Sequence, residues 1–255
     1  MGSEVVEDVE DVDVVIEAEV NEERGVAQER LWGTGIVVAI DGPSGSGKSS
    51  TSRGVARELG LRYLDTGAQY RAVTWWMLAH RVDLADQQAV AAASLQPLLD
   101  SGTDPEEPTI SVDGARVDAE IRGAAVTAAV SRVAGVPTVR ARLVEAQREY
   151  IRRALAAGPG IVVEGRDIAE VVWPVAEAKI YLTADQAVRA ARREAENGGA
   201  DVARTLADLA RRDAEDARTT RPMEAAPGAV VVDGSYLTLA EVVDEIVRIA
   251  GAVRG

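Results

Sequence analysis

The residues best suited by type and spacing to do chemistry lie in one stretch, Gly42-Pro43-Ser44-Gly45-Ser46-Gly47-Lys48-Ser49. It fits the pattern G-x-x-x-x-G-K-[ST], in which glycines let consecutive backbone N–H groups turn toward phosphate oxygens. The lysine of such a loop reaches the β- and γ-phosphates of a nucleoside triphosphate, and the next hydroxyl binds magnesium. Lys48 and Ser49 are therefore expected to bind the nucleotide and Mg²⁺, respectively.

The segments on either side of this loop have the composition that such a site requires. Residues 36–40 form a continuous apolar run typical of a buried strand, and a helical pattern at 48–59 ends before Gly60. The positive end of that helix adds to the attraction for phosphate. A glycine-rich turn without a ligand is the alternative, and the strand and helix around the loop make it the weaker one.

Four further apolar runs of strand length follow, at residues 61–64, 161–164, 178–182 and 229–233. Short runs of this kind are typical of parallel strands that are covered on both faces. Helical patterns lie between them, and residues 239–253 close the chain as a helix. We therefore expect an α/β fold, a P-loop NTPase core with a five-stranded parallel sheet covered by helices.

The block 84–157 interrupts this alternation, and we expect it to be a substrate-binding insertion that covers the site. Its expected elements are a helix at 84–99, a small β-hairpin at 109–117 and helices at 123–134 and 137–157. An Asp113-Gly114 turn supports the hairpin.

The expected core is made of the two segments on either side of the insertion, 33–83 and 158–255. The second segment contains an arginine-rich helical stretch that runs from Arg189 to Arg221. We expect about 196–222 within it to form a helical lid. A helix at 68–81 has His80, the sole histidine, at its end, where a surface or capping role is expected.

Acidic residues concentrate at the N-terminus. Residues 1–30 hold eleven Asp and Glu against Arg24 and Arg30, a local net of −9 out of −14, which leaves −5 for the rest. Dense like charge without turn residues predicts that residues 1–32 form a disordered tail, with an acidic interaction tail as the alternative.

The composition also excludes several classes of protein. There is no cysteine, which removes disulfides and cysteine-type zinc sites and suits a cytoplasmic protein. The net charge of −14 argues against a general nucleic-acid binder. No apolar run is long enough to cross a membrane, and the acidic start is unlike a signal peptide. We expect a soluble cytoplasmic monomer without nucleic-acid or membrane partners.

Three more stretches place polar residues where an acceptor could bind. Leu64-Asp65-Thr66-Gly67-Ala68-Gln69-Tyr70-Arg71 and Glu164-Gly165-Arg166-Asp167 each follow an expected strand, and Arg211 to Arg218 concentrates cations and carboxylates. Ligands of α/β folds bind at the carboxyl ends of the strands. The first two stretches should therefore meet near the P-loop.

Together with the P-loop, these stretches resemble the bacterial cytidylate kinases, a family of nucleoside monophosphate kinases. The insertion agrees, from Val112-Asp113-Gly114 to Glu120-Ile121-Arg122, and the resemblance covers about residues 35 to 250. It implies transfer of the γ-phosphoryl group of ATP to CMP or dCMP, with Mg²⁺, giving ADP and CDP or dCDP. Such transfer depends on positioning and charge neutralisation.

The resemblance also implies roles for individual residues. The catalytic cations would be Lys48, Arg166, Arg212 and Arg218. The nucleotide-binding set would be Gly42, Pro43, Ser44, Gly45, Ser46, Gly47, Lys48, Ser49 and Ser50, with Ser49 on the metal. The acceptor set would be Thr66, Tyr70, Arg71, Arg140, Arg166, Asp167 and Asp216.

Two of these roles, recognition of the cytosine amine and closure of the lid, have a clear physical reason. Asp167 and Asp216 correspond to carboxylates near the base and sugar, and a carboxylate accepts the cytosine amine but repels the carbonyl of uracil. Arg212 and Arg218 would lie in the lid, which closes over the phosphates and excludes water. Arg211 sharing or taking the role of Arg212 stays an alternative.

Simpler interpretations of several residues stay open. Arg189 and Arg192 would then be solvated helix faces, Tyr70 a core aromatic and Asp167 a helix cap, while Trp76 is expected to pack. Two other functions also stay open: a kinase of another small acceptor such as UMP or shikimate, and a non-enzymatic P-loop nucleotide switch.

Overall fold

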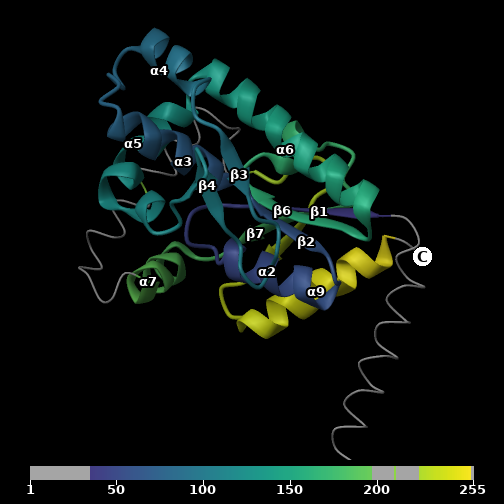
Figure 1. Cartoon of the computed structure of the whole chain (residues 1–255). Coiled ribbons are helices and arrows are strands. Elements are labelled where there is room, and N and C mark those ends of the chain that lie inside the picture. The colour runs from purple at the N-terminus through teal and green to yellow at the C-terminus, as the bar shows by residue number, and fades with distance from the viewer. Residues whose placement is uncertain (1–34, 197–209, 211–223, 254–255) are drawn as a thin grey trace, which may run out of the picture. The chain divides into compact units, whose positions relative to one another are not determined.

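The computed structural model describes residues 35–196, 210 and 224–253 (Figure 1). Contacts separate Met1–Thr34 from Gly35–Gly255, and the fold described here is that of the second unit. The acidic segment 1–32 and most of the expected lid at 196–222 lie outside the described residues, so both expectations stay predictions.

A five-stranded parallel sheet in the order β2-β6-β1-β7-β8 forms the core. Its strands are β1 (Ile36–Asp41), β2 (Arg62–Asp65), β6 (Gly160–Gly165), β7 (Ala178–Thr183) and β8 (Val230–Asp233). β1 lies in the centre with all six residues buried. The predicted α/β fold and its five strands are confirmed, with strand ends shifted by at most one residue.

Helices cover both faces of this sheet. α2 (Lys48–Glu58) and α9 (Leu239–Ala252) pack together on one face, and α6 (Pro137–Ala157) lies on the other (Figure 1). α2 and α9 approach closely at Gly54, where an added Cβ would lie 2.6 Å from a methyl group of Val243. The helix α7 (Gln186–Glu196) follows β7.

The helix α3 (Thr66–Ala79) begins two residues earlier than its sequence pattern predicts. Asp65 explains the difference, because its side chain accepts the Ala68 N–H at 2.9 Å and caps the helix. At the other end His80 stacks on Trp76 with ring centroids 3.8 Å apart, and Trp76 is 8% exposed. The packing role expected for Trp76 is confirmed.

The segment between α3 and β6 contains a second, antiparallel sheet. Its elements in chain order are α4 (Gln87–Ser94), β3 (Leu99–Ser101), β4 (Ile110–Val112), β5 (Ala115–Arg116), the 3-10 turn η1 (Glu120–Arg122), α5 (Ala124–Ala134) and α6. The predicted hairpin is confirmed as β4 and β5, with Asp113 and Gly114 at φ of 51° and 81° in its turn.

The helix predicted at 84–99 is wrong at its C-terminal end. It stops at Ser94, and Leu99–Ser101 pairs with β4 to give a three-stranded sheet. Asp113 directs this pairing, because its carboxylate accepts the Leu98 N–H at 2.8 Å while its own N–H donates to the Leu98 carbonyl at 2.8 Å. Pro97, between the two elements, prevents the helix from continuing.

A one-turn π-helix, η2 (Ile168–Val172), directly follows β6 and the Arg166-Asp167 pair. Among the described residues, no helix has both the length and the apolar composition that a membrane span requires.

Candidate active site

The phosphate-binding pattern forms the connection between β1 and α2. Gly42 takes a φ of 154° and Gly47 a φ of 93°. A Cβ on Gly42 would lie 2.1 Å from the Leu182 carbonyl oxygen of β7, so no other residue fits there. The loop therefore has the tight backbone path that lets its N–H groups converge at the start of α2.

Lys48, the first residue of α2, is held over the loop by a hydrogen bond from Nζ to the Pro43 carbonyl at 2.8 Å. Burial lowers the pKa of Lys48, and the nearby Arg166 guanidinium lowers it further. Glu164 and Asp41 oppose that shift and help to keep the ammonium charged. A desolvated ammonium of this kind binds phosphate strongly.

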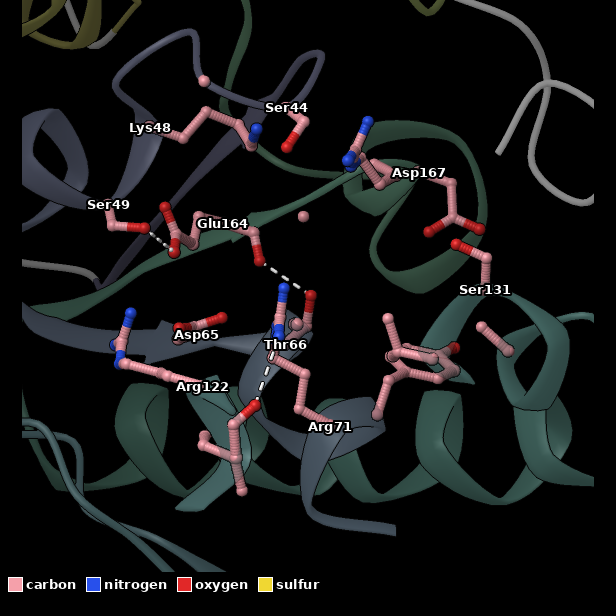
Figure 2. A pocket seen from close by; sticks show the side chains of 18 of the residues that line it. Ser44, Lys48, Ser49, Asp65, Thr66, Arg71, Arg122, Ser131, Glu164 and Asp167 are labelled. Carbon is pink, nitrogen blue, oxygen red and sulfur yellow. Dashed lines mark hydrogen bonds between the residues drawn. The ribbon is translucent and has the colours of Figure 1, made fainter. Parts of the chain in front are cut away.

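Ser49 forms a second polar centre with Glu164 at the end of β6. The Ser49 hydroxyl donates to Glu164 Oε1 at 2.7 Å (Figure 2). The Tyr63 hydroxyl donates to the same oxygen at 2.9 Å. Burial raises the pKa of Glu164, and the carboxylate of Asp65 raises it further. The other oxygen, Oε2, is buried without a hydrogen-bond partner among the described residues.

These oxygens fit a magnesium ion. Mg²⁺ prefers hydroxyl and carboxylate oxygens and takes its remaining ligands from substrate phosphates and water. The described residues contain no group of three or more His, Cys, Asp and Glu side chains that could hold a metal alone. The site therefore suits an ion that arrives with a nucleotide.

The P-loop opens into a pocket of about 580 Å³ (Figure 2). The P-loop residues that line it are Ser44, Gly45, Gly47, Lys48, Ser49 and Ser50. Six of the seven predicted acceptor residues also line it, namely Thr66, Tyr70, Arg71, Arg140, Arg166 and Asp167. These six residues come from three separate parts of the sequence and share one cavity with the loop.

Arg140 on α6 and Asp167 after β6 form an ion pair inside this pocket, with side chains that are 19% and 13% exposed. In the described chain the Asp167 side chain makes no capping hydrogen bond to η2, so the helix-cap interpretation is wrong. Tyr70 lies beside the pair, and burial raises its pKa to about 12. It remains a neutral hydroxyl at physiological pH.

Thr66 and Arg71, both on α3, are oriented by contacts with other elements. The Thr66 hydroxyl donates to the Glu164 carbonyl at 2.7 Å, which joins the start of α3 to the end of β6. Arg71 Nη1 donates to the Ile121 carbonyl at 3.1 Å and to the Thr127 hydroxyl at 3.0 Å. Thr66 therefore shapes the pocket, and Arg71 presents a fixed cation to it.

Sequence reasoning missed several residues of the site. Arg122 and Ser131 line the pocket from η1 and α5, and Ser131 lies near Asp167 (Figure 2). Glu164 belongs to the stretch Glu164-Gly165-Arg166-Asp167, but no role was assigned to it from the sequence. For Ser131 the available signal was its place on one face of α5 together with Val130 and Ala134, which also line the pocket.

The simpler interpretation of Arg189 and Arg192 as solvated helix faces is wrong. Arg189 is 5% exposed, and its Nη1 donates to the Ser44 carbonyl at 3.0 Å. Arg192 donates to the carbonyls of Ser46 at 3.0 Å and Gly234 at 2.6 Å. Two cations of α7 thus bind the outer carbonyl groups of the P-loop and support its backbone.

The remaining predicted site residues, Arg212, Asp216 and Arg218, lie outside the described residues. Their assignment to the lid and to the acceptor stays a prediction.

Comparison with known proteins agrees with this arrangement. The family model described as "Cytidylate kinase" matches residues 38–252. A cytidylate kinase of Streptomyces avermitilis is 54% identical over 215 residues, which cover 84% of this chain and 92% of the relative. One of Nocardia farcinica is 52% identical over 85% of this chain and 94% of the relative, and one of Rhodococcus opacus is 49% identical over 86% and 96%. The chain belongs to the cytidylate kinase family.

Proposed function

We propose that this protein transfers the γ-phosphoryl group of ATP to CMP or dCMP and releases ADP and CDP or dCDP. The observation that carries the proposal is the shared pocket, in which the P-loop lies beside Arg71, Arg140 and Asp167. A nucleotide switch would need the loop but not the second set of side chains. Similarity to relatives named cytidylate kinase supports CMP as the acceptor.

On the donor side, the P-loop N–H groups bind the phosphates of ATP, and Lys48 neutralises charge on the β- and γ-phosphates. Ser49 and Glu164 would hold Mg²⁺, directly or through water, and the ion would add charge neutralisation across the same phosphates. Arg189 and Arg192 keep the loop in the shape that this binding requires.

On the acceptor side, Arg71, Arg140 and Arg166 hold the phosphate of CMP, and Asp167 accepts the exocyclic amine of cytosine. An oxygen of the acceptor phosphate attacks the γ-phosphorus in line, a new P–O bond forms, and the bond to the β–γ bridging oxygen breaks. The acceptor phosphate is largely dianionic at pH 7, so its attack needs no general base. The site works by positioning and charge neutralisation.

The lid residues complete the proposal. Arg212 and Arg218 would close over the phosphates and exclude water, and Asp216 would bind the nucleoside of the acceptor. We further propose that the protein acts in the cytoplasm, which its lack of cysteine suits, and that it acts as a monomer.

An acceptor panel tests the proposal. ADP release is measured with ATP and Mg²⁺ in the presence of CMP, dCMP, UMP, shikimate or no acceptor. We expect CMP or dCMP to stimulate release at least 100-fold over the blank and UMP to be much poorer. Stimulation by UMP or shikimate instead would identify another small-molecule kinase, and ADP release that no acceptor changes would reject phosphoryl transfer to a nucleotide.

A further inference from the structure

Asp41, the last residue of β1, contacts the acceptor side of the site although it directly precedes the P-loop. It is 5% exposed. Its carboxylate accepts two consecutive backbone N–H groups, that of Ile168 on Oδ1 at 2.9 Å and that of Ala169 on Oδ2 at 2.9 Å. These two residues directly follow Arg166 and Asp167. A buried carboxylate of the donor strand is thus bonded to the backbone that carries the acceptor side chains.

This contact replaces the usual cap of η2. The first N–H groups of a helix lack partners within it, and the preceding residue often supplies one from its side chain. Asp167 holds that preceding position, but in the described chain its carboxylate pairs with Arg140 and does not cap η2. Because Asp41 satisfies the N–H groups from another strand, Asp167 is left to face the pocket.

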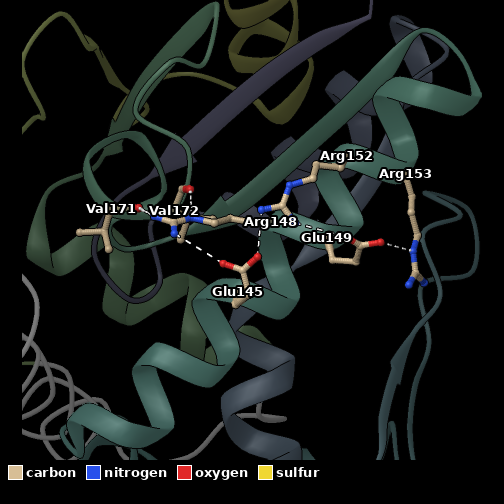
Figure 3. Close-up of polar contacts among 7 residues, drawn as sticks. All are labelled: Glu145, Arg148, Glu149, Arg152, Arg153, Val171 and Val172. Atoms are coloured by element: carbon tan, nitrogen blue, oxygen red, sulfur yellow. Dashed lines mark hydrogen bonds and ion pairs between the residues drawn. The ribbon is translucent and has the colours of Figure 1, made fainter.

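Arg148 on α6 holds the other end of η2 (Figure 3). Its Nε donates to the Val172 carbonyl at 3.0 Å, and its Nη2 donates to the Val171 carbonyl at 2.9 Å. Glu145, one turn earlier on α6, pairs with the same guanidinium at 3.6 Å. Side chains from two other elements therefore hold both ends of the segment that follows Asp167.

We propose that Asp41 is a positioning residue of the acceptor site, which fixes Asp167 by binding the backbone directly after it, with Arg148 holding the far end of η2. Asp41 does not contact the acceptor and acts through Asp167. This inference rests on the proposed function, since it concerns the acceptor half of that reaction.

The substitution Asp41→Asn tests it with little change in size. An amide offers one acceptor oxygen and places a donor opposite the second N–H group, so one of the two bonds is lost. We expect the KM for CMP, and the Kd for CMP measured by calorimetry without ATP, to rise about tenfold. The Kd for ATP should rise less than the Kd for CMP, because Glu164 remains beside Lys48 when the Asp41 charge is removed. An unchanged affinity for CMP, or an equal loss of affinity for ATP, would overturn the proposal.

A further test uses a pair of variants at the far end of η2 and leaves β1 unchanged. Arg148→Ala should raise the KM for CMP about threefold. Arg153→Ala is the matched control, because Arg153 lies on the same helix and pairs with Glu149 at 2.9 Å, with no bond to η2. Equal effects of the two substitutions would contradict the proposed role of η2. This pair decides the question if Asp41→Asn does not fold.

A double substitution separates positioning from general destabilisation. If Asp41 acts through Asp167, Asp41→Asn should change the KM for CMP less than twofold in an Asp167→Ala background. A tenfold change there would show that Asp41 acts by another route. Wild-type protein without CMP-dependent ADP release would reject the proposed function. If the wild type releases ADP in response to CMP and the Asp41→Asn variant has the same affinity for CMP, this inference alone is rejected.

Discussion

At the scale of single residues, the site contains buried charges that each have a neighbour of the opposite sign. Lys48 lies near Glu164 and Asp41, and Arg140 pairs with Asp167. Each of these groups is costly to bury alone, and the pairing reduces that cost. Removing one member should therefore affect the half of the reaction that it serves.

Lys48→Met removes the ammonium and keeps most of the side-chain length. We expect kcat to fall at least 100-fold with either CMP or dCMP, about 3 kcal/mol of transition-state stabilisation. Lys179 on β7 lies outside the pocket and provides the control. Lys179→Met should keep activity within threefold, and similar losses in both variants would contradict the role of Lys48. Steady-state kinetics with each acceptor measures the difference.

Asp167→Ala should lower kcat/KM for CMP about 100-fold and leave the affinity for ATP within twofold. The substitution removes the carboxylate that we propose accepts the cytosine amine, and it leaves Arg140 without this partner. Titration calorimetry with ATP and with CMP, each alone, separates the two effects. A matching loss of ATP affinity would be incompatible with an acceptor role.

Asp41 makes stability depend on pH. Burial raises the pKa of Asp41 from 3.8 to about 6, and the carboxylate of Asp167 also raises it. The two backbone hydrogen bonds and Lys48 lower this pKa, but burial outweighs them. The folded state then holds the proton more tightly than the unfolded state. Its stabilising contribution is present below pH 4 and is lost as pH rises through about 6, on the order of 3 kcal/mol.

In the Asp41→Asn variant this position no longer binds or releases a proton, because an amide does not titrate in this pH range. The free energy of unfolding of the wild type, minus that of the variant, should fall between pH 4 and pH 6 and stay level above about pH 7. Urea unfolding across that range measures it. Parallel curves for the two proteins would show that Asp41 titrates normally.

At the scale of elements, α7 supports the P-loop from outside. Its arginines bind the carbonyl groups of Ser44 and Ser46, on the backbone whose N–H groups must face the phosphates. The loop shape thus depends on a helix more than 130 residues further along the chain, with Arg192 to Ser46 spanning 146 positions.

Arg192→Ala should therefore weaken ATP binding about tenfold while the Kd for CMP stays within twofold. Two hydrogen bonds from a charged donor are lost, each worth about 1 kcal/mol or more. Arg248→Ala on α9 is the control, because Arg248 pairs with Glu245 at the surface and is 67% exposed. A weakened CMP affinity, with ATP binding unchanged, would contradict the role of α7.

The secondary-structure elements also show which parts of the fold could be predicted from the sequence. Apolar runs predicted all five parallel strands, because such strands are buried on both faces. β3 was missed, because Leu99–Ser101 has no alternation of its own and depends on Asp113 for its pairing. The bond between Asp41 and Ile168 spans 127 positions, and no local pattern indicates it.

At the scale of the whole molecule, the parallel sheet brings the residues of the proposed donor and acceptor sites together. β1 and β6 are neighbours, so the P-loop after β1 meets Arg166 and Asp167 after β6 at one edge. β2 pairs with β6 and brings Thr66 and Tyr70 to the same edge. Motifs and a family resemblance were enough to predict these residues. The supporting contacts of Arg189, Arg192 and Arg148 required the structure.

The most direct test of the central claim follows the transferred group itself. ATP labelled at the γ-phosphorus is incubated with the protein, Mg²⁺ and CMP, and the labelled products are separated. We predict that the label appears in CDP, at least tenfold above the label in inorganic phosphate. Label released as inorganic phosphate at a rate that CMP does not change would contradict phosphoryl transfer between nucleotides in this pocket.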